Sequence, residues 1–92
     1  MKIYWSSAAR ADLGRLYDFL ARHDLNAANR VLDRLVACPS ALLRFPRRGQ
    51  KLSRYEPREI REFRVVSYVV RYQLTEDTLS ILRIFHGRED RF

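Results

Sequence analysis

The segment that decides the fold contains three runs: Arg58-Glu59-Ile60-Arg61-Glu62-Phe63, Ser67-Tyr68-Val69-Val70-Arg71-Tyr72 and Ser80-Ile81-Leu82-Arg83-Ile84-Phe85-His86-Gly87-Arg88. Each run mixes β-branched and aromatic residues with arginine, which is typical of strands. The polar segment Thr75-Glu76-Asp77-Thr78 lies between the second and third runs and predicts a turn. The pattern therefore predicts three successive antiparallel strands.

Four arginines lie within or beside these predicted strands rather than in loops: Arg61, Arg64, Arg71 and Arg83. Because an antiparallel sheet commonly packs one face and leaves the other in water, we expect one face to be basic and at least partly exposed. We expect the function to reside on that face.

The last run is apolar on both of its predicted faces. Strict alternation places Leu79, Ile81 and Phe85 on one face and Leu82 with Ile84 on the other. A strand that is apolar on both sides is typical of the centre of a sheet. We therefore expect another strand to cover its open edge.

The preceding half of the chain predicts a strand and two helices. The strand is expected at 3–5, and Ser6 or Ser7 is expected to cap the first helix. The apolar positions of the two helices recur at helical spacing: Ala9, Leu13, Leu16, Tyr17 and Leu20, then Ala28, Val31, Leu32, Leu35 and Val36. Asn26 is expected to cap the second helix, and so short a connection implies an antiparallel helical hairpin.

Two features interrupt the second half of this pattern. Pro39 cannot donate a backbone hydrogen bond, so we expect the helix to bend there and to continue for another turn or two. The stretch 45–57 contains two prolines, Gly49 and few apolar residues, which predicts an exposed loop.

These elements predict one α+β domain over residues 1–92, with the order β-α-α-β-β-β. In this two-layer fold the first strand lies beside the last one, and the helical hairpin buries one face of an antiparallel sheet. A chain of 92 residues can bury one modest core and leaves no room for a second domain.

Composition narrows the class of partner. The formal net charge is +7, and only Lys2 and Lys51 among the 18 basic residues are lysine. Arginine suits paired contacts with carboxylates and phosphates, although a base-composition bias in the genome would also explain its excess. The charge favours an anionic partner, either nucleic acid or an acidic protein segment.

Other features bear on compartment and cofactors. Cys38 is the single cysteine, which excludes an intrachain disulfide and a cysteine-zinc cluster. No apolar stretch is long enough for a membrane span, and the first residues lack the apolar core of a signal peptide. We expect a cytoplasmic protein without a membrane partner, metal or cofactor.

The ordered set of these features resembles the RelE/ParE superfamily of bacterial toxins from type II toxin-antitoxin modules. The residues that carry the resemblance are Trp5 and Ser7, Ala11-Asp12-Leu13, Ala28 and Arg30, Phe45-Pro46 with Gly49, and the stretches 58–72 and 81–88. The likeness extends over nearly the whole chain. It implies a small basic toxin that a cognate antitoxin neutralises with an acidic, partly disordered segment, in a hetero-oligomeric complex.

The resemblance implies docking of the antitoxin on the helical hairpin and on a sheet edge. It leaves two activities open. ParE-like members inhibit DNA gyrase, whereas RelE-like members cleave messenger RNA on the ribosome. In this chain Val69 stands where cleaving members usually have an arginine, three residues before Tyr72, and Gly87 follows His86 where they often have a tyrosine. The loop before the strands has only Lys51 as a lysine. These departures favour the ParE-like branch and a protein that is not an enzyme.

The candidate site residues follow from both arguments. For binding of antitoxin or target we expect Arg61, Arg64, Arg71, Arg83, His86 and Arg88. Arginines on a half-exposed sheet also pair with neighbouring acids such as Glu59 and Glu62, so a structural role stays open for them. In the alternative, ribonuclease reading, Arg61, Arg83 and His86 would supply the cations and the acid or base.

Overall fold

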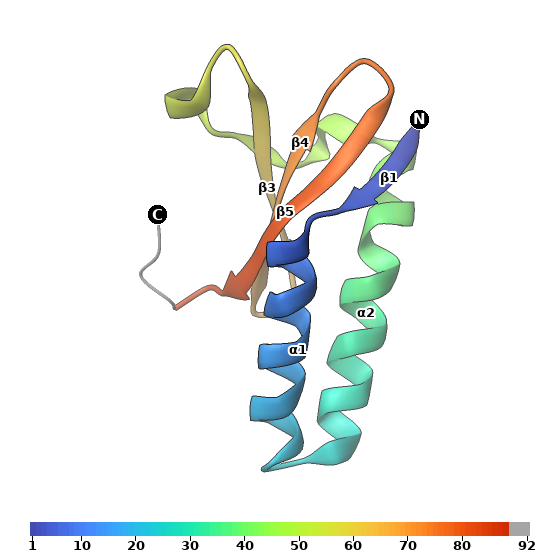
Figure 1. Cartoon of the computed structure of the whole chain (residues 1–92), viewed down its shortest axis with the longest axis vertical. Coiled ribbons are helices and arrows are strands. Elements are labelled where there is room, and N and C mark those ends of the chain that lie inside the picture. Colours follow the sequence, from blue (N-terminus) through green and yellow to red (C-terminus); the bar gives the residue numbers. More distant parts are fainter. Residues whose placement is uncertain (89–92) are drawn as a thin grey trace.

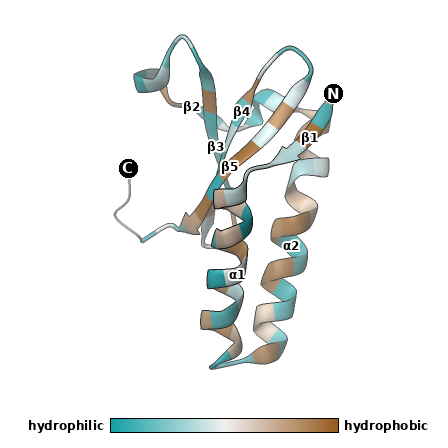
Figure 2. Cartoon of the chain, in the orientation of Figure 1, coloured by the Kyte–Doolittle hydropathy of each residue, from teal (hydrophilic) through white to brown (hydrophobic). Residues whose placement is uncertain are grey.

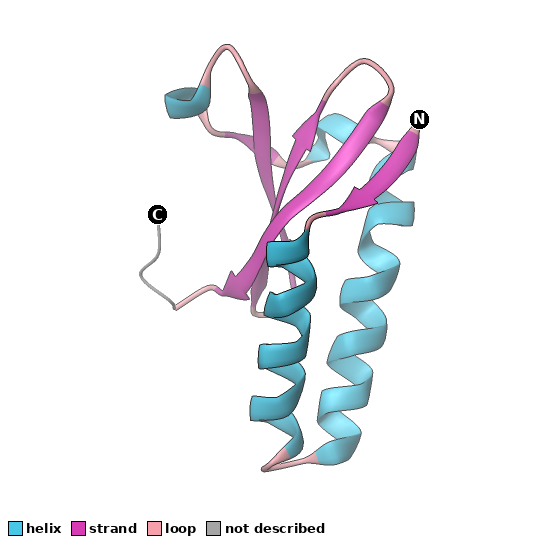
Figure 3. Cartoon of the chain, in the orientation of Figure 1, coloured by secondary structure: helices cyan, strands magenta, loops and turns pink. Residues whose placement is uncertain are grey.

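A computed structural model describes residues 1–88 and shows a helical hairpin beside a twisted sheet (Figures 1 and 3). The elements in chain order are β1 (Lys2–Trp5), α1 (Ser7–Ala21), α2 (Leu25–Arg44), β2 (Gln50–Lys51), β3 (Glu59–Val65), β4 (Tyr68–Leu74) and β5 (Thr78–His86). Short 3₁₀ turns at Pro46–Arg48 and Ser53–Tyr55 flank β2. The fold is α+β, as the sequence predicted.

The sheet has five strands in the order β1-β5-β4-β3-β2. β1 pairs with β5 in parallel and the other pairs are antiparallel, so the sheet is mixed. The predictions that β5 is central and that the first strand covers its edge are confirmed. The prediction of a strandless loop at 45–57 is wrong, because Gln50 and Lys51 pair with Glu62 and Arg61.

The helix boundaries follow from their caps. The Ser6 hydroxyl accepts a hydrogen bond from the Ala9 amide at 3.0 Å, which confirms one of the two predicted caps of the first helix. Asp24, and not Asn26, caps α2 by accepting the Ala27 amide at 3.1 Å. The connection is tighter than predicted, because the amides of His23 and Asp24 both donate to the Leu20 carbonyl. α2 then runs through Pro39 to Arg44, which confirms the additional turn.

The core lies between the helical hairpin and one face of the sheet. Figure 2 shows hydrophobic segments along β5 and both helices. The most buried large side chains of the protein come from α2 and the three long strands: Leu35, Leu42, Ile60, Val70, Tyr72, Leu79, Ile81 and Ile84. Ile60 is an exception in position, since it lies on the outer face of β3. Within residues 1–88, neither helix is both long and apolar enough to cross a lipid bilayer.

A register shift between β4 and β5 changes which residues face the helices. Arg71 pairs with Arg83 but Tyr72 pairs with Ile81, so Leu82 is an extra residue in β5. The bulge puts Ile84 on the helix side with Ile81, and Phe85 on the outer face. The predicted grouping of Phe85 with Ile81 is therefore wrong, because strict alternation fails at the bulge.

Candidate partner-binding site

Three of the four strand arginines share the outer face of the sheet, away from the helices. Glu62, Arg71 and Arg83 are register partners in one row, and Arg64 lies opposite Val69 in the next row. Arg61 is instead opposite the buried Tyr72 on the helix side, so the prediction of a common face is wrong for this residue. The outer face is also less exposed to solvent than predicted, since Arg71 is only 5% exposed.

Arg83 is held by a carboxylate from α1. Arg83 Nε donates a hydrogen bond to Asp12 Oδ2 at 2.9 Å, and Arg83 Nη2 donates one to Asp12 Oδ1 at 3.0 Å. The same carboxylate accepts the backbone amide of Ile84 at 2.8 Å. Asp12 reaches β5 because α1 begins where β1 ends: the Ser6 amide donates to the Ile81 carbonyl, and the Ser6 hydroxyl donates to the Leu82 carbonyl.

The electrostatics of Asp12 reflect this arrangement. Burial by itself would raise the pKa of Asp12, but the hydrogen bonds from Arg83 and from the Ile84 amide lower it below its ordinary value. The charges of Arg83 and Arg15 act in the same direction, with Arg15 Nη2 lying 3.6 Å from Asp12 Oδ1. Asp12 is therefore ionised and joins the helical layer to the sheet.

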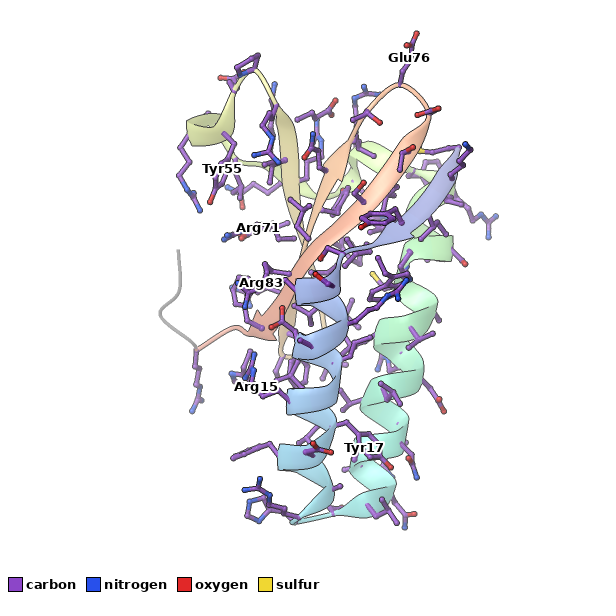
Figure 4. All side chains as sticks on the ribbon, in the orientation of Figure 1. Arg15, Tyr17, Tyr55, Arg71, Glu76 and Arg83 are labelled. Carbon is purple, nitrogen blue, oxygen red and sulfur yellow. The ribbon has the colours of Figure 1, made fainter. Side chains whose placement is uncertain are left out.

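Arg71 lies between two aromatic rings. Its Cζ is 5.8 Å from the Tyr55 ring centre and 5.3 Å from that of Phe85, within range of cation-π attraction. Nε and Nη2 both donate to one carboxylate oxygen of Glu62. Figure 4 shows Tyr55, Arg71, Arg83 and Arg15 in succession down one side of the molecule. These contacts give Arg71 a structural role in fastening the Ser53–Tyr55 turn to the sheet.

Arg61 is engaged in a similar way near β2. It donates through Nε to Glu59 at 2.9 Å, and through Nη1 to the carbonyls of Arg47 at 3.1 Å and Gly49 at 2.8 Å. Burial alone would raise the pKa of Glu59, but hydrogen bonds from Arg61 and Arg47 lower it. The expectation that Glu59 and Glu62 pair with strand arginines is confirmed for Arg61 and Arg71.

A groove with an apolar wall lies between α1 and the ends of β4 and β5. We call it the α1–β5 groove; its volume is about 550 Å³, and it is lined by Arg15, Leu16, Phe19, Tyr68, His86 and Arg88. The His86 ring packs edge-on against the Tyr68 ring, with centres 5.3 Å apart. The Arg88 amide donates to His86 Nδ1 at 3.1 Å, so this nitrogen serves as an acceptor. An apolar wall with cationic groups at its rim suits a protein partner whose surface carries apolar and acidic side chains.

The structure brings together only some of the predicted site residues. His86 and Arg88 line the α1–β5 groove. Arg64 lies next to them, because a Cβ added to Gly87 would approach Arg64 Nη1 to 2.7 Å. Arg15, Phe19 and Tyr68 also line the groove but were not predicted as site residues. Phe19 carried a sequence signal, because it is a large aromatic residue outside the predicted apolar stripe of its helix. In the structure it is 59% exposed.

The backbone positions of the three residues of the ribonuclease reading are spread over the sheet. Arg61 belongs to the register row of Tyr72 and Ile81, whereas His86 belongs to the row of Val65 and Tyr68. Four residues and two strand spacings separate their Cα atoms by roughly 16 Å. Arg83 lies on the opposite face from both. Among residues 1–88 no three His, Cys, Asp or Glu side chains gather to hold a metal ion.

Comparisons with known proteins agree with this fold. Residues 3–91 match the family model described as the ParE toxin of type II toxin-antitoxin systems, parDE. The chain belongs to the ParE toxin family. It is 33% identical to Toxin RelE2 of Caulobacter vibrioides over 87 residues, covering 94% of each protein. It is 36% identical to Toxin RelE1 of the same organism, covering 94% of this chain and 92% of the relative.

A solved structure shares the fold of this family member. The chromosomal ParDE toxin-antitoxin system from P. aeruginosa includes a chain that superposes with a TM-score of 0.77 at 20% identity, covering 94% of this chain and 95% of that one. The protein is thus a toxin of the RelE/ParE superfamily, which confirms the resemblance seen in the sequence. Membership in a toxin-antitoxin family makes an antitoxin its partner.

Proposed function

We propose that this toxin binds and inhibits DNA gyrase without a catalytic site of its own, and that a cognate antitoxin neutralises it. The observation that carries the proposal is the separation of Arg61, Arg83 and His86. Metal-free RNA cleavage requires a base, an acid and cations within hydrogen-bonding reach of one phosphate. Here the Cα atoms of Arg61 and His86 are roughly 16 Å apart, and Arg83 is turned to the other face and paired with Asp12.

The α1–β5 groove is the surface that we assign to the target. It combines the exposed ring of Phe19 with His86 and the cationic rim of Arg15 and Arg88. In this proposal Arg61, Arg71 and Arg83 hold the fold together, while His86 and Arg88 contact the target. The cytoplasm is the compartment required, since gyrase acts on chromosomal DNA.

The proposal is tested by inducing the toxin in bacteria and following pulse labelling of DNA with thymidine and of protein with methionine. Gyrase inhibition predicts that thymidine incorporation falls first, with messenger RNA intact. Phe19→Ala should delay the arrest at equal protein level, because it removes the apolar anchor of the groove. Leu25→Ala is the matched control, since Leu25 is 57% exposed but lies outside the groove.

A RelE-like, ribosome-dependent ribonuclease is the second candidate. The names of the two Caulobacter relatives, Toxin RelE2 and Toxin RelE1, favour it. It predicts the reverse order in the same experiment, with methionine incorporation falling first and messenger RNA cut. An arrest of that kind would contradict gyrase as the target.

A further inference from the structure

The net charge of the chain is unevenly distributed. Residues 44–58 contain six cationic side chains and a single carboxylate, that of Glu56, so this segment carries +5 of the net charge of +7. The rest of the chain contains twelve cations and ten carboxylates. A base-composition bias would raise the arginine content along the whole chain and would not collect the charge in one segment. We call residues 44–58 the cationic segment.

All six cations of the cationic segment are exposed: Arg44, Arg47, Arg48, Lys51, Arg54 and Arg58. Two of them are partly neutralised by carboxylates. Arg47 Nε lies 2.9 Å from Glu59 Oε2, and Lys51 Nζ lies 3.1 Å from Glu56 Oε2. The segment nevertheless keeps a clear excess of positive charge at the surface.

Arg44 and Arg48 have no carboxylate partner within residues 1–88. Arg48 is positioned by aromatic rings instead, with its Cζ 5.6 Å from the centre of the Phe45 ring and 5.7 Å from that of the Phe63 ring. A cation-π contact orients a guanidinium but does not neutralise it, so its N–H donors remain available to an anion. Both arginines line one shallow hollow of about 400 Å³ together with Phe45.

The backbone that carries these arginines is fixed to the sheet. The Tyr72 hydroxyl donates to the Pro46 carbonyl at 2.7 Å and accepts a hydrogen bond from the Gly49 amide at 2.9 Å. Arg61 Nη1 donates to the carbonyls of Arg47 and Gly49. The turn therefore presents its side chains in an ordered arrangement, which lowers the entropy cost of binding a partner.

The cationic segment lies away from the α1–β5 groove. Figure 1 shows it crossing the upper part of the molecule between α2 and β3, whereas β5 ends at the lower left. Tyr68 at the start of β4 lines the α1–β5 groove, and Leu74 at the end of β4 lines a hollow with Arg47 and Arg58. Six residues of extended strand separate Tyr68 from Leu74 by roughly 20 Å. The two surfaces can therefore contact two different partners at once.

The chemistry of the cationic segment suits a nucleic acid better than a protein. A protein interface usually has an apolar centre. Within residues 44–58, all of which the structure describes, Phe45 is the only large apolar side chain that is exposed. A guanidinium binds a phosphate through two parallel hydrogen bonds, and duplex DNA carries one negative charge for about every 1.7 Å of its axis.

We propose that the cationic segment binds the phosphate backbone of duplex DNA, with Arg44 and Arg48 as the main phosphate contacts. The choice of DNA over RNA rests on the proposed inhibition of gyrase, whose substrate is duplex DNA. The toxin then contacts gyrase through the α1–β5 groove and the DNA that gyrase holds through the cationic segment. Gyrase loaded with DNA is consequently a tighter target than free gyrase.

The first test measures binding of the purified toxin to a short, fluorescein-labelled DNA duplex by anisotropy, in the absence of gyrase. The double variant Arg44→Gln/Arg48→Gln should bind roughly tenfold or more weakly than the wild type. Arg22→Gln/Arg30→Gln is the matched control, because both residues are exposed on the helical hairpin and the same charge is lost. It should bind within about threefold of the wild type.

The salt dependence gives a second readout. The logarithm of the binding constant falls linearly with the logarithm of the salt concentration, with a slope of about −0.9 for each phosphate contact. Arg44→Gln/Arg48→Gln should make this slope shallower by about 2, whereas the control variant should keep the wild-type slope. Equal losses of affinity and slope in the two double variants would mean that net charge alone attracts DNA, which would overturn the proposal.

Two further probes separate DNA from other polyanions. An RNA duplex of the same sequence or a polyglutamate peptide that binds roughly tenfold more tightly than the DNA would make RNA or an acidic protein the partner, and would overturn the proposal. Absence of binding to DNA would overturn it as well. None of these results touches the proposed inhibition of gyrase, because gyrase is absent from the measurements.

The last measurement adds gyrase. The wild-type toxin should bind gyrase loaded with DNA more tightly than free gyrase, and Arg44→Gln/Arg48→Gln should bind both equally. A wild-type toxin with the same affinity for both would contradict the proposed contact with the DNA that gyrase holds. A toxin that binds DNA through the cationic segment but does not bind gyrase would refute gyrase as the target and leave the DNA-binding surface in place.

Discussion

At the scale of single residues, Asp12 joins the two layers of the fold. Asp12 is only 4% exposed, and its carboxylate binds both Arg83 and the Ile84 amide. The Asp12→Asn variant loses the charge and one bond to the guanidinium. We expect the free energy of unfolding to fall by about 2–3 kcal/mol, measured by urea denaturation at pH 7. Asp18→Asn on the exposed side of α1 is the control and should change it by about 0.5 kcal/mol or less.

Asp12 should also make the stability of the protein depend on pH in acid. The pKa of Asp12 in the folded state lies below its ordinary value of 3.8, so the folded protein holds this proton less tightly than the unfolded chain. The stabilisation is complete above the unfolded-state pKa and is lost as the pH falls through the lower folded-state pKa. The wild type should therefore lose more stability than Asp12→Asn below about pH 4. Parallel losses in both proteins would contradict this role.

Val66 shows local backbone strain at the turn between β3 and β4. Its φ is 58°, in the left-handed region that a β-branched residue rarely adopts, and its side chain is 57% exposed. Val66→Gly should raise the stability by about 1 kcal/mol, because relief of strain exceeds the added chain entropy. Thermal unfolding measures the gain. Ser67→Gly is the control and should not stabilise, since Ser67 is not in that region.

At the scale of elements, Tyr72 fastens the connection between α2 and β2 to the centre of the sheet. Its buried hydroxyl donates to the Pro46 carbonyl at 2.7 Å and accepts the Gly49 amide at 2.9 Å. Burial raises the pKa of Tyr72, so it remains a neutral donor. Gly49 permits this approach, since a Cβ there would lie 2.5 Å from the hydroxyl.

Tyr72→Phe leaves both backbone groups without their partner. We expect a loss of about 2 kcal/mol in the free energy of unfolding, measured by denaturant titration. Tyr17→Phe is the matched control, because the Tyr17 hydroxyl donates to Asn29 at an exposed position where water can replace it. Equal effects of the two variants would contradict the anchoring role.

The elements that the sequence predicted carry a clear apolar signal. α1 and α2 have apolar residues at helical spacing, and the three long strands mix β-branched and aromatic residues, whereas β2 consists of Gln50 and Lys51, two exposed polar residues. The bulge at Leu82 also left no local signal. The sequence predicted the arginines of the strands as site residues, but it did not predict all the carboxylates that pair with them. Asp12 and Arg83 are 71 positions apart, and no local pattern reveals such a contact.

At the scale of the whole molecule, the net charge of +7 should govern association with the antitoxin. Charged contacts near the surface are screened by salt, with a Debye length of about 10 Å at 0.1 M and about 3 Å at 1 M. We expect the affinity to fall roughly tenfold or more between about 0.05 M and 0.5 M sodium chloride, measured by fluorescence anisotropy. A constant affinity over this range would mean that apolar contacts alone hold the complex.

Inhibition of gyrase by binding, without cleavage of RNA, is the activity that we propose for this ParE-family toxin. The most direct measurement is gyrase supercoiling of relaxed plasmid in the presence of the purified toxin, run beside a cleavage assay on ribosomes programmed with messenger RNA. We predict that supercoiling is lost while the RNA stays intact. Messenger RNA cut in the ribosomal A site, with gyrase unaffected, would contradict the claim.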